Sequence, residues 1–175
     1  MARAFVSVGS NINPEENTAR ALSALGREAR ITNISTVYLT EPEGRPEQPP
    51  FYNCVVEIET ELSPGELKHK VLRRIEEGLG RERTADRYAA RTIDLDLVLY
   101  DDLVMTTEGL TLPDPDIVRR PFLAVPLSEL APKLVLPGSG LCIAEAAAAL
   151  PLGSMKPLEN YTERLRKEVL YGRKE

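Results

Sequence analysis

Two aspartates, Asp94 and Asp96, occupy alternate positions in the stretch from Thr92 to Tyr100, which is otherwise rich in leucine, isoleucine and valine. Alternate side chains of a β-strand share one face, so the two carboxylates are expected side by side, with Cα atoms about 6.6–6.8 Å apart. Such neighbours repel each other, and a divalent cation removes the repulsion. Mg²⁺ commonly takes one or two carboxylates and completes its shell with water and phosphate. The alternative is an acidic exposed strand face, although aspartate is a poor strand former.

A cluster of arginines precedes the aspartates: Arg81, Arg83, Arg87 and Arg91. Guanidinium groups stay charged and bind phosphate oxygens through paired hydrogen bonds. Residues 68–91 contain eight Lys or Arg against four Asp or Glu, in a chain whose net charge is −5. A solvated helix face followed by a basic loop would give the same balance. Arginines beside paired carboxylates nevertheless favour a site that binds a metal ion together with the polyphosphate group of a small ligand.

Several kinds of chemistry are excluded or disfavoured. The only histidine, His69, lies between two lysines, which excludes a two-histidine zinc site and disfavours a Ser-His-Asp triad. Two isolated cysteines, Cys54 and Cys142, are expected to be free thiols. The turn Gly9-Ser10-Asn11 is not a P-loop, because no Gly-Lys-Ser/Thr follows it. The acidic balance argues against nucleic-acid binding, and no apolar run is long enough for a membrane span or a signal peptide.

The helices and strands that must position these residues are predicted from the spacing of apolar residues and from the prolines and glycines that interrupt regular structure. Helix starts are predicted at Asn13-Pro14 and Ser63-Pro64, each with glutamate three residues after the cap. In the strand over 92–100, the four residues Ile93, Leu95, Leu97 and Leu99 are predicted to share the core face. Strands are expected over 4–8, 31–40, 51–61 and 92–100, of which 51–61 should be half-exposed, and a hairpin is expected over 103–112. Helices are expected over 14–28, 63–77, 122–130, 144–150 and 161–175. Loops are expected over 41–50 and 81–90. The strands have polar faces, which predicts a mixed, largely antiparallel sheet with helices on its faces.

Several motifs, taken in order, resemble the 6-hydroxymethyl-7,8-dihydropterin pyrophosphokinase family of folate biosynthesis. They are Val8-Gly9-Ser10-Asn11, Tyr38-Leu39-Thr40, Phe51-Tyr52-Asn53, Glu76 through Gly80-Arg81, Arg91-Thr92-Ile93-Asp94-Leu95-Asp96, and Arg120-Pro121-Phe122. The resemblance implies an α+β fold, a ferredoxin-like three-layer α-β-α arrangement with a mostly antiparallel sheet. It also implies a pyrophosphokinase domain over 1–137, with a C-terminal helical extension over 138–175 packed on it or trailing from it.

The implied reaction moves the pyrophosphoryl group of ATP to the 6-hydroxymethyl group of the dihydropterin and releases AMP. The resemblance places two Mg²⁺ ions on Asp94 and Asp96. It implies that the catalytic residues are Arg81, Arg83, Arg91, Asp94 and Asp96. The residues implied for ATP are Glu76, Arg81, Arg91, Thr92, Asp114 and Arg120, and those implied for the pterin are Thr40, Pro42, Glu43, Gly44, Phe51, Asn53 and Phe122. Without the resemblance, the two phenylalanines could equally be core residues and Asn53 a turn residue.

The sequence departs from the family pattern at Asp114, where the family commonly has histidine, and at Ala89-Ala90, where it commonly has Gly-Pro. Two other functions therefore stay open: a non-catalytic pterin- or nucleotide-binding module, and a Mg²⁺-dependent nucleotidyl or phosphoryl transferase with another acceptor. The expected partners are ATP and the hydroxymethyl-dihydropterin, without nucleic acid or membrane. The protein is expected to be a cytoplasmic monomer.

Overall fold

A six-stranded sheet, in which every pairing is antiparallel, forms the middle layer of the molecule. The structure is a computed structural model that describes residues 1–86, 88–107 and 109–172. The strands of this sheet are β1 (Ala2–Ser10), β2 (Arg30–Ile34), β3 (Tyr38–Thr40), β4 (Phe51–Thr60), β5 (Asp94–Tyr100) and β8 (Lys156–Pro157). The order is β5-β1-β4-β3-β8, with β2 also on β4, so β1 lies between the strand of the aspartates and the strand of Phe51 and Asn53. The hairpin of β6 (Met105–Thr107) and β7 (Leu110–Leu112) is separate, and Glu108 of its predicted turn lies outside the described residues.

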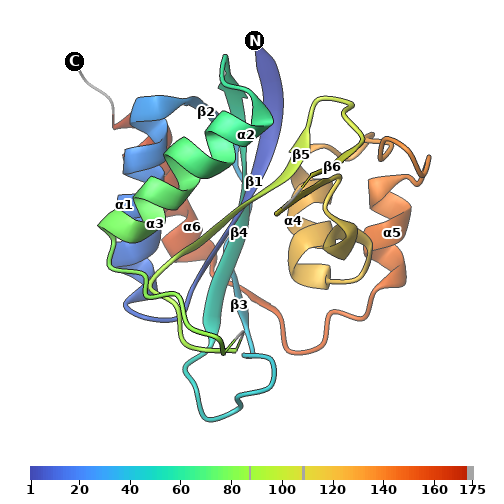
Figure 1. Cartoon of the computed structure of the whole chain (residues 1–175). Helices are drawn as coiled ribbons and strands as arrows, with labels where there is room; N and C mark the ends of the chain where they lie inside the picture. The colour runs from blue at the N-terminus through green and yellow to red at the C-terminus, as the bar shows by residue number, and fades with distance from the viewer. Residues whose placement is uncertain (87, 108, 173–175) are drawn as a thin grey trace.

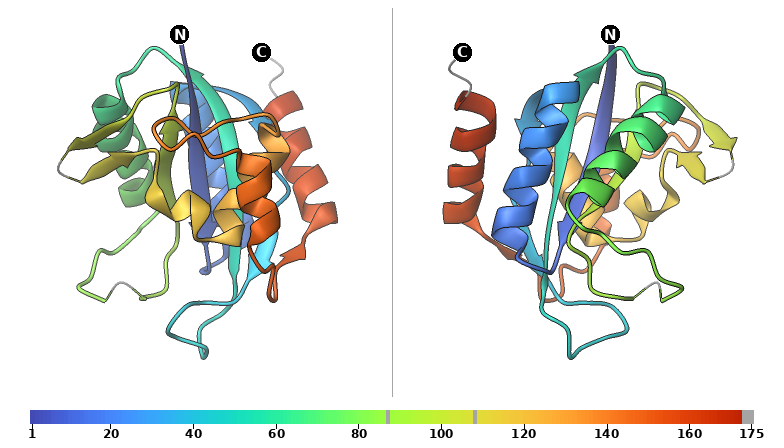
Figure 2. Two further views of the ribbon diagram at one scale, coloured as in Figure 1. Left: turned by 90° about the vertical axis from the view of Figure 1, so that its right-hand side faces the viewer. Right: turned by 60° about the vertical axis from the view of Figure 1, so that its left-hand side comes forward.

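Helices cover both faces of the sheet, as Figures 1 and 2 show. One face carries α1 (Pro14–Glu28), the continuous α2 (Pro64–Glu66), η1 (Leu67–Leu72) and α3 (Arg73–Gly78), and α6 (Glu159–Arg166) with η3 (Lys167–Tyr171). The other face carries η2 (Pro115–Val118), α4 (Pro121–Leu130) and α5 (Ile143–Ala149). Each face has its own hydrophobic core, one around Val6, Leu22 and Val56, the other around Phe5 and Leu127. These layers confirm the predicted α+β class and the mostly antiparallel sheet.

The two predicted helix starts differ in their capping. Ser63 forms the predicted capping box with Glu66, because each side chain bonds the backbone N–H of the other residue. Asn13 is the N-cap of α1 and Pro14 its first residue, as predicted. The Asn13 backbone is left-handed, with φ of 41°, and its side chain makes no capping bond. Instead the amide of Asn17 donates to the carbonyl oxygen of Ile12 over 2.6 Å, so a residue inside the helix secures its start.

The single strand predicted over 31–40 was wrong, because the chain breaks at residues 35–37 into β2 and β3. Ser35 causes the break by pairing with Val55 through its side chain. Its hydroxyl accepts from the Val55 N–H over 2.9 Å, and its own N–H donates to the Val55 carbonyl over 3.0 Å. The half-exposed strand predicted over 51–61 is buried on both faces at its centre, since Val55 and Val56 belong to opposite cores.

In β5, the prediction that Leu99 shares a face with the other leucines was wrong. The register between β1 and β5 shifts between Phe5 and Val6, so the chain carries a β-bulge there. Leu95 and Leu97 therefore lie in the core that β5 shares with η1 and α3, while Leu99 lies in the core that contains residues of α4. The strand begins at Asp94, which places the two aspartates at its first and third residues.

The C-terminal segment is part of the three layers. Strand β8, which the sequence did not predict, pairs with β3, and α6 buries Tyr161 and Leu165 against the main core. The Thr162 hydroxyl accepts from the Val37 N–H over 2.9 Å, so α6 also stabilises the break between β2 and β3. Within the ranges that the structure describes, no helix has the length and apolar character needed to span a membrane.

Candidate active site

A cavity of about 290 Å³ opens beside β1, β4 and β5, between the loop over 41–50, the loop over 81–90 and α4. Both loops lie at the same end of the sheet, at the bottom of Figure 1. The cavity gathers ten of the residues predicted from the sequence. They are Thr40, Glu43, Phe51, Asn53, Arg91, Asp94, Asp96, Asp114, Arg120 and Phe122.

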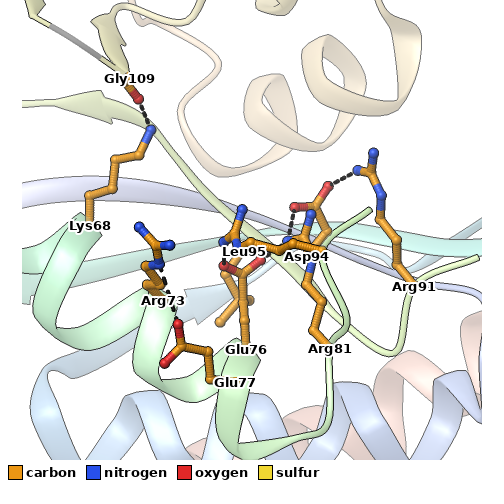
Figure 3. Close-up of polar contacts among 10 residues, drawn as sticks. Lys68, Arg73, Glu76, Glu77, Arg81, Arg91, Asp94, Leu95 and Gly109 are labelled. Carbon is orange, nitrogen blue, oxygen red and sulfur yellow. Dashed lines mark hydrogen bonds and ion pairs between the residues drawn. The ribbon is translucent and has the colours of Figure 1, made fainter. Parts of the chain in front are cut away.

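Asp94 is the meeting point of the predicted arginines and carboxylates (Figure 3). Arg81 Nη1 donates to one carboxylate oxygen over 2.8 Å, and Arg91 Nη1 donates to the other over 2.5 Å. Arg81 also pairs with Glu76, which is 3% exposed and additionally accepts from the Leu95 N–H over 3.2 Å. Charge-assisted pairs in such a confined place are strong and directional. The buried glutamate therefore fixes Arg81 beneath the carboxylate.

Asp96 differs from Asp94 because its carboxylate forms no ion pair within the described part of the chain. The Asp96 side chain is exposed and lines the open cavity. Desolvation by the cavity walls, together with the negative charges of Asp94 and Asp114, raises the pKa of Asp96 to about 7. A cation that entered this corner would relieve the repulsion.

The opposite wall of the cavity combines aromatic and amide groups. Phe51 and Phe122 come from β4 and α4, respectively, and Asn53 is the second residue after Phe51 on the strand. The Asn53 amide donates to the Thr40 hydroxyl over 2.7 Å, which fixes its orientation. Its oxygen packs against Gly9, where an added Cβ would lie 2.8 Å away. A flat heterocycle with polar edges needs this combination of apolar faces and fixed edge partners.

Arg120 and Asp114 stand on the α4 side of the cavity. Arg120 pairs with Glu43 from the loop over 41–50 and, over 3.2 Å, with Asp116, and its guanidinium lies 5.6 Å from the centre of the Phe122 ring. Asp114 caps η2 by accepting from the Asp116 N–H over 2.9 Å. Partial burial raises the pKa of Asp114, while that hydrogen bond opposes the shift. Asp114 thus has a structural partner of its own.

A second cavity, of about 270 Å³, adjoins the first and shares Asp96 and Asp114 with it. Lys68 from η1 reaches across it to the carbonyl oxygen of Gly109 in the hairpin (Figure 3). Thr107 and Thr111 are further polar residues in the lining of this second cavity. The two carboxylates therefore stand at the junction of two connected spaces, which a long polyanionic ligand could bridge.

Six predicted site residues do not line the larger cavity: Pro42, Gly44, Glu76, Arg81, Arg83 and Thr92. Glu76 and Arg81 lie behind Asp94, and Arg83 Nη2 is 2.9 Å from Glu76. The Thr92 hydroxyl is buried without a hydrogen-bond partner among the residues described. Sequence reasoning missed Gly9, Asp116 and Tyr88 as cavity residues. Gly9 was visible only as part of a motif, and Asp116 only as a turn residue after proline.

The comparisons with known proteins agree with this geometry. The family model of 7,8-dihydro-6-hydroxymethylpterin-pyrophosphokinase matches residues 5–132. The chain belongs to this pyrophosphokinase family. The 2-amino-4-hydroxy-6-hydroxymethyldihydropteridine pyrophosphokinase of Haemophilus influenzae is 42% identical over 142 residues, which cover 79% of this chain and 88% of that protein. The enzyme of the same name from Pseudomonas aeruginosa is 36% identical over 159 residues, covering 89% and 96%.

Among solved structures, a Plasmodium falciparum HPPK-DHPS chain matches with a TM-score of 0.68 at 13% identity. The match covers 95% of this chain but only 44% of that one, so this chain spans less than half of the Plasmodium protein. At this identity the likeness shows the fold alone. Membership of the pyrophosphokinase family, from the sequence matches, establishes pyrophosphate transfer in folate biosynthesis as the activity of this chain.

Proposed function

We propose that this pyrophosphokinase uses ATP as donor and 6-hydroxymethyl-7,8-dihydropterin as acceptor, with two Mg²⁺ ions at Asp94 and Asp96. One observation carries the proposal: a single cavity joins the paired aspartates to the wall of Phe51, Asn53 and Phe122. An anionic phosphate donor bound at the aspartates and a flat heterocycle bound at the aromatic wall would meet within that cavity.

The donor set fits magnesium. No group of three or more His, Cys, Asp or Glu side chains within the described ranges is placed to hold a metal alone. Mg²⁺ does not require such a group, since it usually binds one or two carboxylates together with substrate phosphates and waters. When bound, the metal would neutralise phosphate charge and orient the triphosphate. Asp96 is the more available ligand, because Asp94 is already paired with Arg81 and Arg91.

The arginines would act by holding charge in place. In the proposed reaction the hydroxymethyl oxygen attacks the β-phosphorus, the bond from that phosphorus to the oxygen bridging it to the α-phosphorus breaks, and AMP leaves with this oxygen. The hydroxyl proton passes to solvent, since the described lining of the cavity contains no histidine or lysine. Arg91 and Arg120 line the cavity and would bind phosphate oxygens after exchanging their carboxylate partners. Arg81, with Glu76 behind it, would position Asp94, and Arg83 would join from the loop.

The pterin would lie between Phe51 and Phe122, with its amide edge on Asn53. The Thr40 hydroxyl orients Asn53, and Glu43 holds the loop of Pro42 and Gly44 to α4 through Arg120. The nucleoside would extend past Asp114, toward the second cavity. These roles remain proposals, as do the pyrophosphokinase domain over 1–137, its extension over 138–175 and the monomeric state. A cytoplasmic location is supported by the two free cysteines.

One assay tests the proposal. AMP should form from ATP only when both the hydroxymethyl-dihydropterin and Mg²⁺ are present, and the pterin product should gain the mass of a pyrophosphoryl group. Chelation of Mg²⁺ by EDTA should stop the reaction, and added Mg²⁺ should restore it. ADP formation, or AMP formation that does not depend on the pterin, would point instead to a different transferase. Binding of both ligands without turnover would indicate a binding module.

A further inference from the structure

Lys68 on η1 is a half-buried lysine that lines the second cavity. Its ammonium donates to the carbonyl oxygen of Gly109 in the turn of the hairpin, as Figure 3 shows. The nearby Lys70 differs, because it is exposed and pairs with Glu66 on the same helix over 3.9 Å. Of these two lysines, Lys68 is therefore the one that faces a space large enough for part of a ligand.

The backbone that carries Lys68 is held firmly beside β5. Lys68 belongs to the π-helical part of the helix, and π-helical turns are rare and often occur at functional sites. The side chains of Leu67, Val71 and Leu72 anchor this part of the helix, since all three are at most 3% exposed. The segment packs on β5, which is the edge strand of the sheet and carries Asp96. Lys68 thus extends from a fixed position toward the carboxylates.

The charges in the second cavity are unevenly distributed. Lys68 is the only basic residue among the described residues of its lining, and Asp96 and Asp114 line the same space. Desolvation raises the pKa of both carboxyls, and the Lys68 charge opposes each rise, so the ammonium acts on both. A lysine ammonium has three N–H donors, and the described contact with Gly109 uses one of them. Lys68 can therefore bind an anion that enters between the two cavities.

We propose that Lys68 binds the α-phosphate of the donor nucleotide and stabilises the charge that develops there as AMP leaves. The proposal rests on the proposed function, in which the β- and γ-phosphates lie in the cavity of Asp94 and Asp96. The rest of the nucleotide would leave that cavity past Asp96 and Asp114, which line both spaces. The α-phosphate would then lie at the junction, where Lys68 supplies the positive charge from the side of the second cavity.

The chemistry of the transfer gives this contact a catalytic effect. When the bond between the β-phosphorus and the bridging oxygen breaks, its electron pair stays on that oxygen, and the phosphate of AMP becomes more negative. Lys68 keeps its proton throughout and exchanges the Gly109 carbonyl for a phosphate oxygen. Its attraction to that phosphate is stronger in the transition state than in the bound substrate. An interaction of this kind raises kcat rather than lowering KM alone.

The test is Lys68→Met, which keeps the length of the side chain and removes its charge. Three ligands are titrated: AMP, a non-hydrolysable ATP analogue with Mg²⁺, and adenosine, which has no phosphate. Lys68→Met should bind AMP and the analogue about tenfold to a hundredfold more weakly, the usual loss for a hydrogen bond to a charged group. Adenosine affinity should stay unchanged, and kcat should also fall. Lys68→Arg should restore most of the AMP affinity, and the control Lys70→Met should alter none of these values.

A further variant separates the charge from the contact with the hairpin. Lys68→Gln can still donate to the Gly109 carbonyl, and it should lose as much AMP affinity as Lys68→Met while melting near the wild-type temperature. Unchanged AMP affinity in Lys68→Met and Lys68→Gln would overturn the proposal. Equal losses for AMP and adenosine would overturn it too, because they would show that Lys68 only shapes the cavity. If wild-type protein did not bind the ATP analogue, the proposed function itself would fail, which is a separate result.

Discussion

Gly9 of β1 and Asn53 of β4 face each other across paired strands, with the Asn53 side-chain oxygen occupying the space that a Cβ on Gly9 would need. The separation would be 2.8 Å, which is too short for a carbon beside an amide oxygen. Gly9 is therefore part of the proposed pterin site, because its lack of a side chain leaves room for the Asn53 amide that would contact the pterin.

This contact gives the first prediction. Gly9→Ala should displace the Asn53 amide and weaken pterin binding about threefold to tenfold, the net effect of losing one hydrogen bond. Binding of the ATP analogue should change little. Gly65→Ala is the matched control, because an added Cβ there meets nothing within 4 Å. Isothermal calorimetry with each ligand measures both effects, and unchanged pterin affinity in Gly9→Ala would contradict the role of Asn53.

The second prediction concerns the metal. Asp96→Ala and Asp94→Ala should each lower turnover at least about 10²-fold, the scale of losing a main electrostatic contact in the transition state. Asp96→Ala should remain fully folded, since its carboxylate supports no described ion pair. Asp94→Ala should melt at a lower temperature, because it removes the ion pairs that Asp94 makes with Arg81 and Arg91. Asp102→Asn, on an exposed turn, serves as control. Near-normal AMP production in either variant would refute the metal assignment.

The third prediction separates the two ligands. Stacking of a flat base on an aromatic ring is worth about 1–3 kcal/mol by alanine substitution. Phe122→Ala should weaken pterin binding by that amount and leave binding of the ATP analogue nearly unchanged. The neighbouring Arg120 should keep its pairs with Glu43 and Asp116, which hold it independently of the ring. Equal losses for both ligands in calorimetry would show that Phe122 is structural.

The fourth prediction follows from the Asp114 cap. Asp114→Asn should preserve η2, because asparagine is also a good N-cap residue, while it removes a negative charge beside the proposed triphosphate path. Affinity for the ATP analogue should rise by about 1 kcal/mol at low salt, and by less as salt screens the charge. Asp114→His should show the same gain but also a lower melting temperature, since the cap is lost. Weaker nucleotide binding by Asp114→Asn would show that the carboxylate itself contributes to the site.

The fifth prediction concerns pH. The pKa of Asp96 is raised to about 7, so ionising this carboxyl is harder in the folded than in the unfolded protein. Its contribution to stability is complete below the unfolded value near 4 and is lost as pH rises through about 7. Without ligands, the melting temperature should therefore fall between about pH 4 and pH 7 more steeply than in Asp96→Asn. Mg²⁺ together with the ATP analogue should reduce this fall, and parallel melting profiles would disprove the shift.

Local signals in the sequence predicted most elements, because their causes are local. The Ser63 capping box formed as predicted, since all of its atoms lie within four residues. The bulge that places Leu99 in the other core depends on how β5 pairs with β1. The spacing of apolar residues within β5 carries no information on that pairing. The break at Ser35 likewise depends on Val55 and on Thr162, far along the chain. Non-local pairing overrode a β-branched run that is locally typical of one strand.

The site was predictable to a similar extent. Residue types and spacing predicted Asp94, Asp96 and Arg91 as members of one site, and the three line the same cavity. The sequence did not reveal that Arg81 lies behind Asp94 rather than in the cavity, because this depends on the packing of α3 against β5, which buries Glu76 and places it between Arg81 and the Leu95 backbone. Gly9 could not be recognised as a neighbour of Asn53 without the pairing of β1 with β4.

Strand β8 bears on the behaviour of the protein in concentrated solution. An uncovered edge strand displays free N–H and C=O groups and recruits other chains into its sheet. Here the edge of β3 is covered by only two residues, Lys156 and Pro157. The proline lacks a backbone N–H, so it cannot donate a hydrogen bond to the strand of another chain. The chain end thus shields the strand that leads into the loop over 41–50. Removal of residues 153–175 should uncover this edge together with the core face beneath α6, and light scattering should then rise with protein concentration as chains self-associate.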